Sequence, residues 1–234
     1  MTRREDSERQ LPLDLAHAEG RSRAHLVVSR ANEAAVSLID RWPDWPAPIV
    51  VLAGPTGSGK SHLGAIWREM TGAVELTRRR ADEGAAPAGE GAALFLDDAD
   101  AGGLDETGLF HALNAVRAGG SFMLITARRF PSAWGVRLPD LASRLKAAAT
   151  VEIGEPDDEL LAGVIAKLFA DRQVEVEPHV IQYMVRRIER SLATAIRVVE
   201  RLDQMALEQQ VRITRALAAE AVEAMDEGQG ELDF

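Results

Sequence analysis

The chain has 234 residues, of which 46% are hydrophobic and 27% charged, the balance of an ordinary soluble globular protein. This length suffices for one domain, or for an α/β domain with a small appendage. The sequence has no apolar run of 18 residues, no signal-type segment at its start and no cysteine, so we expect no membrane span, no disulfide and a cytoplasmic location. The formal net charge of −10 argues against broad, non-specific nucleic-acid binding by the whole chain.

The first 154 residues show strands that alternate with helices. Residues 1–24 are polar and charged apart from one apolar patch, and they are predicted to form a flexible N-terminal tail. Apolar runs predict strands at 49–53, 73–76, 92–96, 121–126 and 150–153, and helical spacing predicts helices at 32–41, 60–70, 106–118 and 139–146. This alternation favours an α/β fold in which helices cover both faces of a parallel sheet.

The pattern changes near Glu155–Pro156, beyond which only helical periodicity remains. Helices are predicted at 157–172, 178–190, 192–208 and 214–225. We therefore expect a nucleotide-binding α/β domain over residues 25–154, a small all-α domain over 155–226 and an acidic C-terminal tail over 227–234.

A complete P-loop signature lies between the strand at 49–53 and the following helix. It consists of Gly54, Pro55, Thr56, Gly57, Ser58, Gly59, Lys60 and Ser61, and we include the next residue, His62, in the expected nucleotide site. The glycines allow backbone N–H groups to surround a phosphate, and the helix that begins at Lys60 adds its positive end. Lys60 would neutralise phosphate oxygens and Ser61 would bind Mg²⁺, so the expected ligand is ADP or ATP with Mg.

A second motif follows the strand at 92–96, where Asp97 and Asp98 stand at the carboxyl end of an apolar run. This pattern is typical of a Walker B strand, in which Asp97 would hold Mg²⁺ through water and Asp98 could orient the attacking water. The alternative is a solvated acidic turn. Since aspartate is shorter than glutamate, Asp98 would be poorly placed for fast hydrolysis.

These motifs, together with Thr126 and the run Leu138–Leu145, resemble the AAA+ module of the DnaA/Hda family, with Hda the closer likeness. The resemblance implies an AAA+ P-loop NTPase fold followed by a small helical lid. It also implies that Thr126 is sensor I and that Arg144 is an arginine finger, which reaches a nucleotide held by a neighbouring subunit. The alternative for Arg144 is a surface ion pair with Asp140, one turn earlier.

The lid departs from the family pattern. The sensor II position, which carries an arginine in the family, is occupied by Ala193, and Arg197 is the candidate substitute one turn later. Without a sensor II cation, the preference for ATP over ADP should weaken.

The N-terminal tail contains a Q-L-x-L-x-L pattern formed by Gln10, Leu11, Leu13 and Leu15. It resembles the hexapeptide with which the family docks on the bacterial β sliding clamp. The alternative is that these leucines pack on the surface of the chain's own globular part.

The resemblance implies a negative regulator of replication initiation that binds nucleotide and the DNA-loaded β sliding clamp and stimulates hydrolysis of the ATP bound to DnaA. Its own ATPase activity should be weak or absent. An autonomous ATPase of the helicase-loader type and a non-catalytic DnaA-binding adaptor are the alternatives. Self-association is left open, as is contact with DNA near the clamp through Arg78–Arg80 or Arg186–Arg187.

Overall fold

A computed structural model describes residues 23, 26–84 and 91–230. The strands are β1 (Ile49–Ala53), β2 (Val74–Leu76), β3 (Ala93–Leu96), β4 (Phe122–Ala127) and β5 (Ala149–Glu152). The helices are α1 (Glu33–Asp40), α2 (Lys60–Thr71), α3 (Glu106–Gly119), α4 (Pro139–Lys146), α5 (Asp158–Asp171), α6 (Pro178–Val185), α7 (Leu192–Gln209) and α8 (Arg215–Gly230), with short 3₁₀ turns η3 (Ala81–Gly84) and η4 (Pro131–Ala133).

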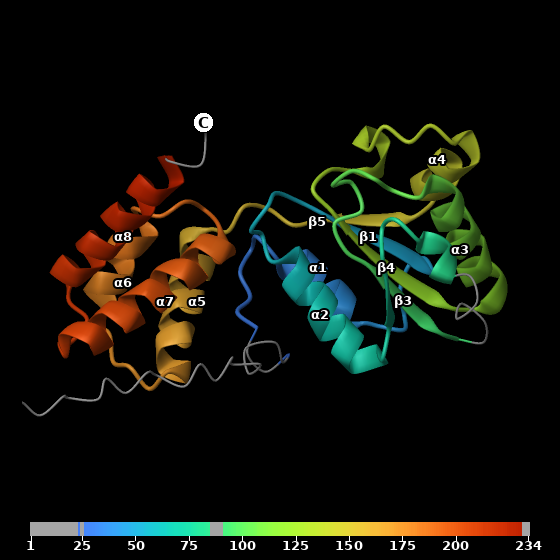
Figure 1. The fold of residues 1–234 in the computed structure, drawn as a ribbon. Coiled ribbons are helices and arrows are strands. Elements are labelled where there is room, and N and C mark those ends of the chain that lie inside the picture. The colour runs from blue at the N-terminus through green and yellow to red at the C-terminus, as the bar shows by residue number, and fades with distance from the viewer. Residues whose placement is uncertain (1–22, 24–25, 85–90, 231–234) are drawn as a thin grey trace, which may run out of the picture.

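The five strands form one parallel sheet in the order β2-β3-β4-β1-β5 (Figure 1). The expected α/β class is therefore confirmed. Strand β1 lies between β4 and β5, although both of these come much later in the chain. Parallel strands need long crossover connections, and helices α2, α3 and α4 supply them here.

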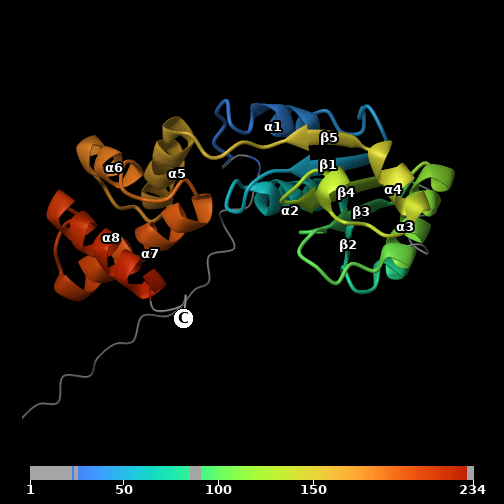
Figure 2. The ribbon, with the colours of Figure 1, turned by 90° about the horizontal axis from the view of Figure 1, so that it is seen from above.

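Helices cover both faces of the sheet, as Figure 2 shows from above. Successive residues of β1 point to opposite faces, so Val51 packs with α3 and α4 whereas Val50 packs with α1 and α2. Because both faces are covered, every residue of β1 is buried, which explains its continuous apolar sequence. Trp67 of α2 is fully buried and stacks on Trp45, with the ring centroids 5.2 Å apart.

Helices α5–α8 build a separate apolar core beside the sheet (Figure 1). Three of these helices begin at residues whose side chains cap the first turn, among them α8, where the Thr214 hydroxyl accepts a hydrogen bond from the Leu217 N–H at 3.3 Å. Asp157 accepts a hydrogen bond from the Leu160 N–H, and Ser191 accepts one from the Thr194 N–H. These caps satisfy amide groups that have no partner within their own helix.

The sequence-based predictions fail locally in three places. The last helix, expected over 214–225, continues to Gly230, so α8 includes the first residues of the expected acidic tail. The helix expected over 178–190 ends at Val185, and the chain then turns so that Ser191 can start α7 in a new direction. The expected loop at 77–91 contains η3, because Ala81 is buried in the core beside α3. Among the described residues, no helix has the length and apolar character needed to span a membrane.

Candidate nucleotide-binding site

The sheet order brings the predicted motifs to one edge. Strands β3, β4 and β1 are neighbours, and their carboxyl ends carry Asp97, Thr126 and the P-loop respectively. The register places Leu52 opposite Thr126 and Leu96 opposite Ile125, so the residues that follow β1 and β3 flank the end of β4. This is the edge where open α/β sheets bind ligands.

The P-loop has the backbone shape of a phosphate cradle. Gly57 and Gly59 have φ values of 76° and 95°, which residues other than glycine rarely adopt. Gly59 is also the N-cap of α2, so the positive end of that helix opens onto the loop. Gly54 is closely packed, since a Cβ there would lie 2.2 Å from the Ile153 carbonyl oxygen. This geometry fits a polyphosphate.

Lys60 lies inside the cradle and is only 7% exposed. Its Nζ donates hydrogen bonds to the Pro55 carbonyl oxygen at 2.6 Å and to the Ser58 hydroxyl at 3.3 Å. Burial lowers the pKa of Lys60, although the carboxylates of Asp98 and Asp97 act in the opposite direction. A bound phosphate would supply further negative charge and favour the ammonium form.

The predicted Mg²⁺ ligands meet beside this lysine. The Ser61 hydroxyl donates to Asp97 Oδ1 at 3.0 Å, and the Thr126 hydroxyl donates to the same oxygen. The Asp98 N–H donates to Thr126 Oγ1 at 2.8 Å, which fixes the hydroxyl between the two strands. Mg²⁺ in nucleotide sites typically takes one or two protein ligands and fills its other positions with phosphate and water. Ser61 and Asp97 fit that requirement.

The described part of the chain contains no group of three or more His, Cys, Asp or Glu side chains that could hold a metal alone. A cation at this corner would therefore depend on the nucleotide phosphates. The remaining predicted contacts, Pro55, Thr56 and His62, lie on the loop and near the start of α2, where Pro55 and His62 are half-buried and Thr56 is exposed.

Asp98 is held by an arginine for which the sequence predicted no role in the site. Arg128, two residues beyond Thr126, donates from Nε and Nη2 to the two carboxylate oxygens of Asp98, each at 3.3 Å. Asp98 also has a positive φ of 52°. Its carboxylate is therefore engaged, in addition to being shorter than a glutamate. The adjacent pair Arg128–Arg129 after a strand that neighbours β3 was the available signal.

Asp100 is enclosed by donors from the same segment, and its side chain is only 1% exposed. It accepts hydrogen bonds from the N–H groups of Arg128 and Arg129, at 2.8 and 3.2 Å, and from Arg129 Nε at 3.1 Å. Burial alone would raise the pKa of Asp100, but these hydrogen bonds and the Arg129 charge outweigh it, so the pKa is lowered. This network anchors the loop after β3 to the loop after β4.

The start of α7 rests directly on the P-loop. The Leu192 N–H donates to the Gly57 carbonyl oxygen at 2.8 Å. A Cβ on Gly57 would lie 2.1 Å from the Ser191 hydroxyl, and one on Gly59 would lie 3.1 Å from a Leu192 methyl group. The helical region therefore touches the phosphate cradle through backbone and small side chains. No motif in the sequence indicated this contact.

The residues considered for sensor II do not supply a free cation to that contact. Ala193 is exposed, and Arg197 Nη2 donates to Thr194 Oγ1 of its own helix at 2.9 Å.

Arg144 is not among the side chains gathered at the P-loop. It is half-buried in the last turn of α4. The chain leaves α4 to start β5 at Ala149, which pairs with Val50 near the beginning of β1, so α4 leads toward the amino edge of the sheet. No hydrogen bond or ion pair joins the Arg144 guanidinium to another described residue, Asp140 included. The clamp-type motif at Gln10, Leu11, Leu13 and Leu15 lies outside the described residues.

Comparison of the structure with solved structures identifies the fold. Domain III of the replication initiation protein DnaA from Thermotoga maritima superposes with a TM-score of 0.73 at 16% identity, covering 88% of this chain and 97% of that one. The RuvB Holliday junction branch migration motor from the same organism gives a TM-score of 0.67 at 20% identity, covering 87% and 72%. The chain thus has the AAA+ fold, a parallel five-stranded sheet with flanking helices and a helical lid.

The comparison of sequences is more specific for the lid. Residues 162–220 match the family model of the Hda lid domain. An uncharacterized protein of Haemophilus influenzae is 28% identical over 110 residues, which is 47% of this chain and 48% of that protein, so the match spans about half of the relative. The chain is therefore similar to Hda in its lid and to DnaA domain III in its fold.

Proposed function

We propose that this protein binds ATP or ADP with Mg²⁺ and regulates replication initiation by stimulating hydrolysis of the ATP bound to DnaA. The observation that carries the proposal is an Hda-type lid whose helix α7 rests on a fully assembled phosphate cradle. In this proposal residues 25–154 form the nucleotide-binding base, residues 155–226 the lid, residues 1–24 the segment for clamp docking, and residues 227–234 an acidic tail.

The nucleotide acts here mainly as a structural ligand. Lys60 neutralises the phosphates, and Ser61 and Asp97 hold Mg²⁺, whose charge stabilises the phosphate oxygens when it is bound. Thr126 holds Asp97 in place through its hydroxyl and is the sensor I residue of this proposal. Turnover at this site is slow because Arg128 engages the Asp98 carboxylate, the group expected to orient water.

Arg144 supplies the chemistry in trans. A guanidinium with no described partner, placed away from its own P-loop, is free to reach a nucleotide on DnaA or on another subunit. There it would stabilise charge on the transferring phosphoryl group, an effect worth roughly 10³-fold or more in hydrolysis rate. The motif Gln10–Leu15 would bring the protein to the DNA-loaded β sliding clamp.

The test is hydrolysis of DnaA-bound ATP in the presence of DNA-loaded clamp. Arg144→Ala should keep nucleotide and clamp binding but lose the stimulation. Lys146→Ala is the matched control, since it removes an exposed cation from the same turn of α4 and should stimulate normally. Normal stimulation by Arg144→Ala would show that the finger is assigned to the wrong residue.

The same assay separates the alternative functions. A Gln10→Ala/Leu11→Ala variant should lose the part of the stimulation of DnaA's ATP hydrolysis that depends on DNA-loaded clamp. A fast ATPase without clamp or DnaA, abolished by Lys60→Ala, would favour an autonomous ATPase. Inhibition of DnaA without any hydrolysis would favour a non-catalytic adaptor.

A further inference from the structure

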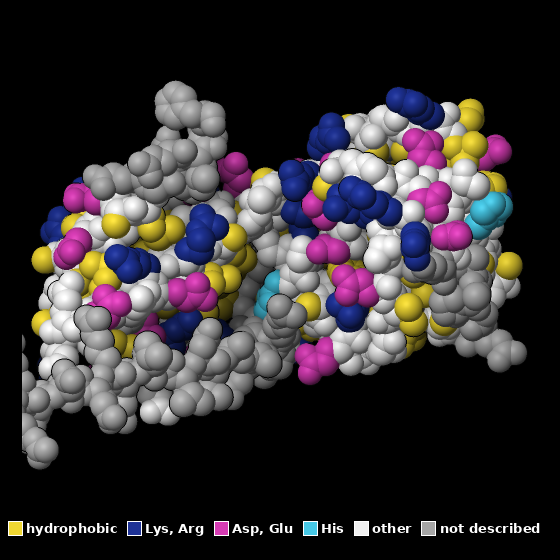
Figure 3. Space-filling model, in the orientation of Figure 1, with side chains coloured by type: hydrophobic (Ala, Val, Ile, Leu, Met, Phe, Trp, Pro, Cys, Tyr) yellow, Lys and Arg dark blue, Asp and Glu magenta, His cyan; other side chains and the backbone are white. Residues whose placement is uncertain are grey.

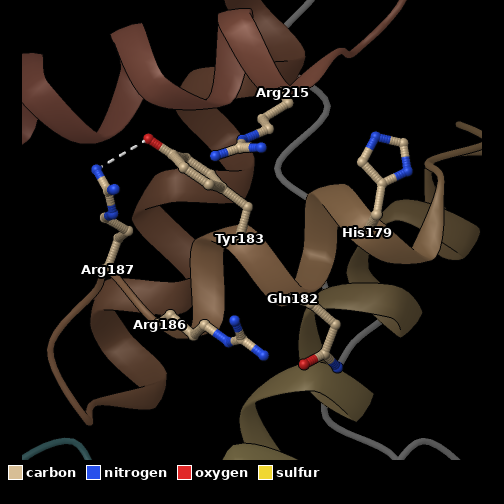
Figure 4. Close-up of a pocket in the computed structure, with 6 residues that line it drawn as sticks. All are labelled: His179, Gln182, Tyr183, Arg186, Arg187 and Arg215. Carbon is tan, nitrogen blue, oxygen red and sulfur yellow. Dashed lines mark hydrogen bonds between the residues drawn. The ribbon is translucent and has the colours of Figure 1, made fainter.

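A surface hollow of about 410 Å³ lies on the lid, far along the chain from the nucleotide site. Its lining residues come from α6, the turn that follows it and the first residue of α8 (Figure 4). They are His179, Gln182, Tyr183, Arg186, Arg187 and Arg215. Three of the six are arginines, and none is acidic.

Tyr183 orders two of these arginines. The guanidinium carbons of Arg187 and Arg215 lie 4.8 and 4.9 Å from the centre of its ring. Arg187 Nη1 also donates to the Tyr183 hydroxyl at 3.1 Å, the dashed line in Figure 4. A guanidinium packed on a ring keeps its N–H edge available for an acceptor. The stacking thus prepares a binding geometry before any ligand arrives.

Three other cations of the lid are neutralised by carboxylates. Lys167, Arg172 and Arg190 pair with Asp171, Asp203 and Asp158 at 2.8, 3.6 and 2.9 Å. By contrast, no ion pair joins Arg186, Arg187 or Arg215 to a carboxylate among the side chains described, those of residues 23, 26–82 and 91–225. Opposite charges are interspersed elsewhere on the surface seen in Figure 3. In a chain of net charge −10, an unneutralised cluster of three arginines indicates an anion site.

We propose that this hollow binds the phosphate backbone of DNA. Backbone contacts typically come from Arg, Gln and Tyr side chains without reading base sequence, and the lining set has this composition. Carbon atoms make up most of the surface of the hollow, but every lining side chain ends in a polar or charged group, and Tyr183 already supports two arginines. Three guanidinium groups favour a polyanion over an apolar peptide segment. The ring therefore serves the guanidiniums and is not a free platform for stacking a base.

This inference goes beyond the proposed function and is independent of Arg144 and of bound nucleotide. If the protein docks on a clamp that encircles DNA, the lid would meet the adjacent duplex. The net negative charge of the chain would keep this contact weak and local, so that it orients the protein on DNA without creating a stable complex by itself.

The experiment measures fluorescence anisotropy of a labelled duplex of about 20 base pairs while salt is raised from about 50 to 200 mM. The full chain is compared with Arg187→Gln/Arg215→Gln. The variant should bind the duplex at least about tenfold more weakly at the lower salt. The slope of log association constant against log salt concentration is negative, and its magnitude should decrease by about 2 in the variant. The control Lys167→Gln/Arg201→Gln removes the same charge from α5 and from the exposed Arg201 of α7 in the same lid, and it should change affinity less than about twofold.

If both double variants lost DNA affinity equally, the net charge of the chain would explain the effect, and the proposal would be overturned. Displacement of the DNA by polyglutamate of equal charge would also overturn it, since that result assigns the site to acidic proteins. Arg187→Lys/Arg215→Lys provides a second measurement that keeps the charge and the fold. It should retain the salt slope but bind several-fold more weakly, because lysine lacks the two-pronged donor. Stimulation of DnaA's ATP hydrolysis is measured on the same variants without free duplex. This second readout tests the proposed function separately from DNA binding by the hollow.

Discussion

The carboxylate of Asp100 is buried and yet keeps its charge at neutral pH. Two backbone N–H groups and the Arg129 guanidinium donate to it, and they lower its pKa despite burial. A carboxylate with a lowered pKa in the folded state stabilises the fold fully above its ordinary pKa of about 3.9. That contribution is lost as the pH falls through the lower, folded-state value.

We predict that Asp100→Asn lowers the free energy of unfolding by about 2 kcal/mol at pH 7, since the amide NH₂ would face donors. The difference between wild type and variant should start to shrink below about pH 4, where the Asp100 carboxylate of the unfolded chain takes up a proton, and should vanish only below the lower, folded-state pKa. Urea unfolding at pH 7 and at lower pH measures both. A difference that stayed constant down to acid pH would contradict the charge-based account.

At the scale of elements, the contact between the P-loop and α7 links the phosphate cradle to the lid. Gly57 permits it in two ways, by its positive φ and by its missing side chain. Gly72, the C-cap of α2, shares the positive φ, at 69°, but a Cβ added there would have no atom within 4 Å. An alanine at Gly72 would therefore introduce backbone strain alone, whereas an alanine at Gly57 would also collide with the lid.

We predict that Gly57→Ala weakens nucleotide binding by about tenfold or more, because the new methyl group displaces Ser191 and the turn must also change shape. Gly72→Ala should cost about 1 kcal/mol of stability and leave nucleotide affinity unchanged. Titration with a fluorescent ADP analogue and thermal unfolding report the two effects. Equal nucleotide affinities in both variants would argue against coupling through this contact.

Much of this architecture could be predicted from sequence because its signals are local. The apolar run Ile49–Ala53, the glycines after it and the acids after Leu96 identify strands, cradle and strand ends without knowledge of the sheet order. The pairing of Arg128 with Asp98 could not be predicted in the same way, since it depends on β3 and β4 being neighbours. The Leu192–Gly57 hydrogen bond uses only backbone atoms, which leave no trace in the sequence.

For the whole molecule, a bound nucleotide should hold the base, built around the sheet, and the lid, built from α5–α8, together. One core lies around the sheet and the other among α5–α8, and the phosphate cradle is where α7 meets the base. A ligand held there binds only the folded state, so it stabilises that state by mass action.

We predict that ADP with Mg²⁺ at about 100 times its Kd adds about 2.7 kcal/mol and raises Tm by roughly 5–10 °C. Lys60→Ala should abolish this rise, since Lys60 is the buried cation of the cradle. Differential scanning calorimetry with and without ligand measures the shift. An unchanged Tm in the wild type at saturating nucleotide would contradict nucleotide binding at this site.

The position of β1 at the centre of a parallel sheet also sets the order in which a growing chain can fold. Both neighbours of β1 are made late, since β4 begins at Phe122 and β5 at Ala149. At about 5–20 residues per second, a ribosome needs roughly 3–14 s to move from the end of β1 to the start of β4. Throughout that interval a fully apolar strand has no partner on either side, which makes early recruitment of a chaperone advantageous for this topology.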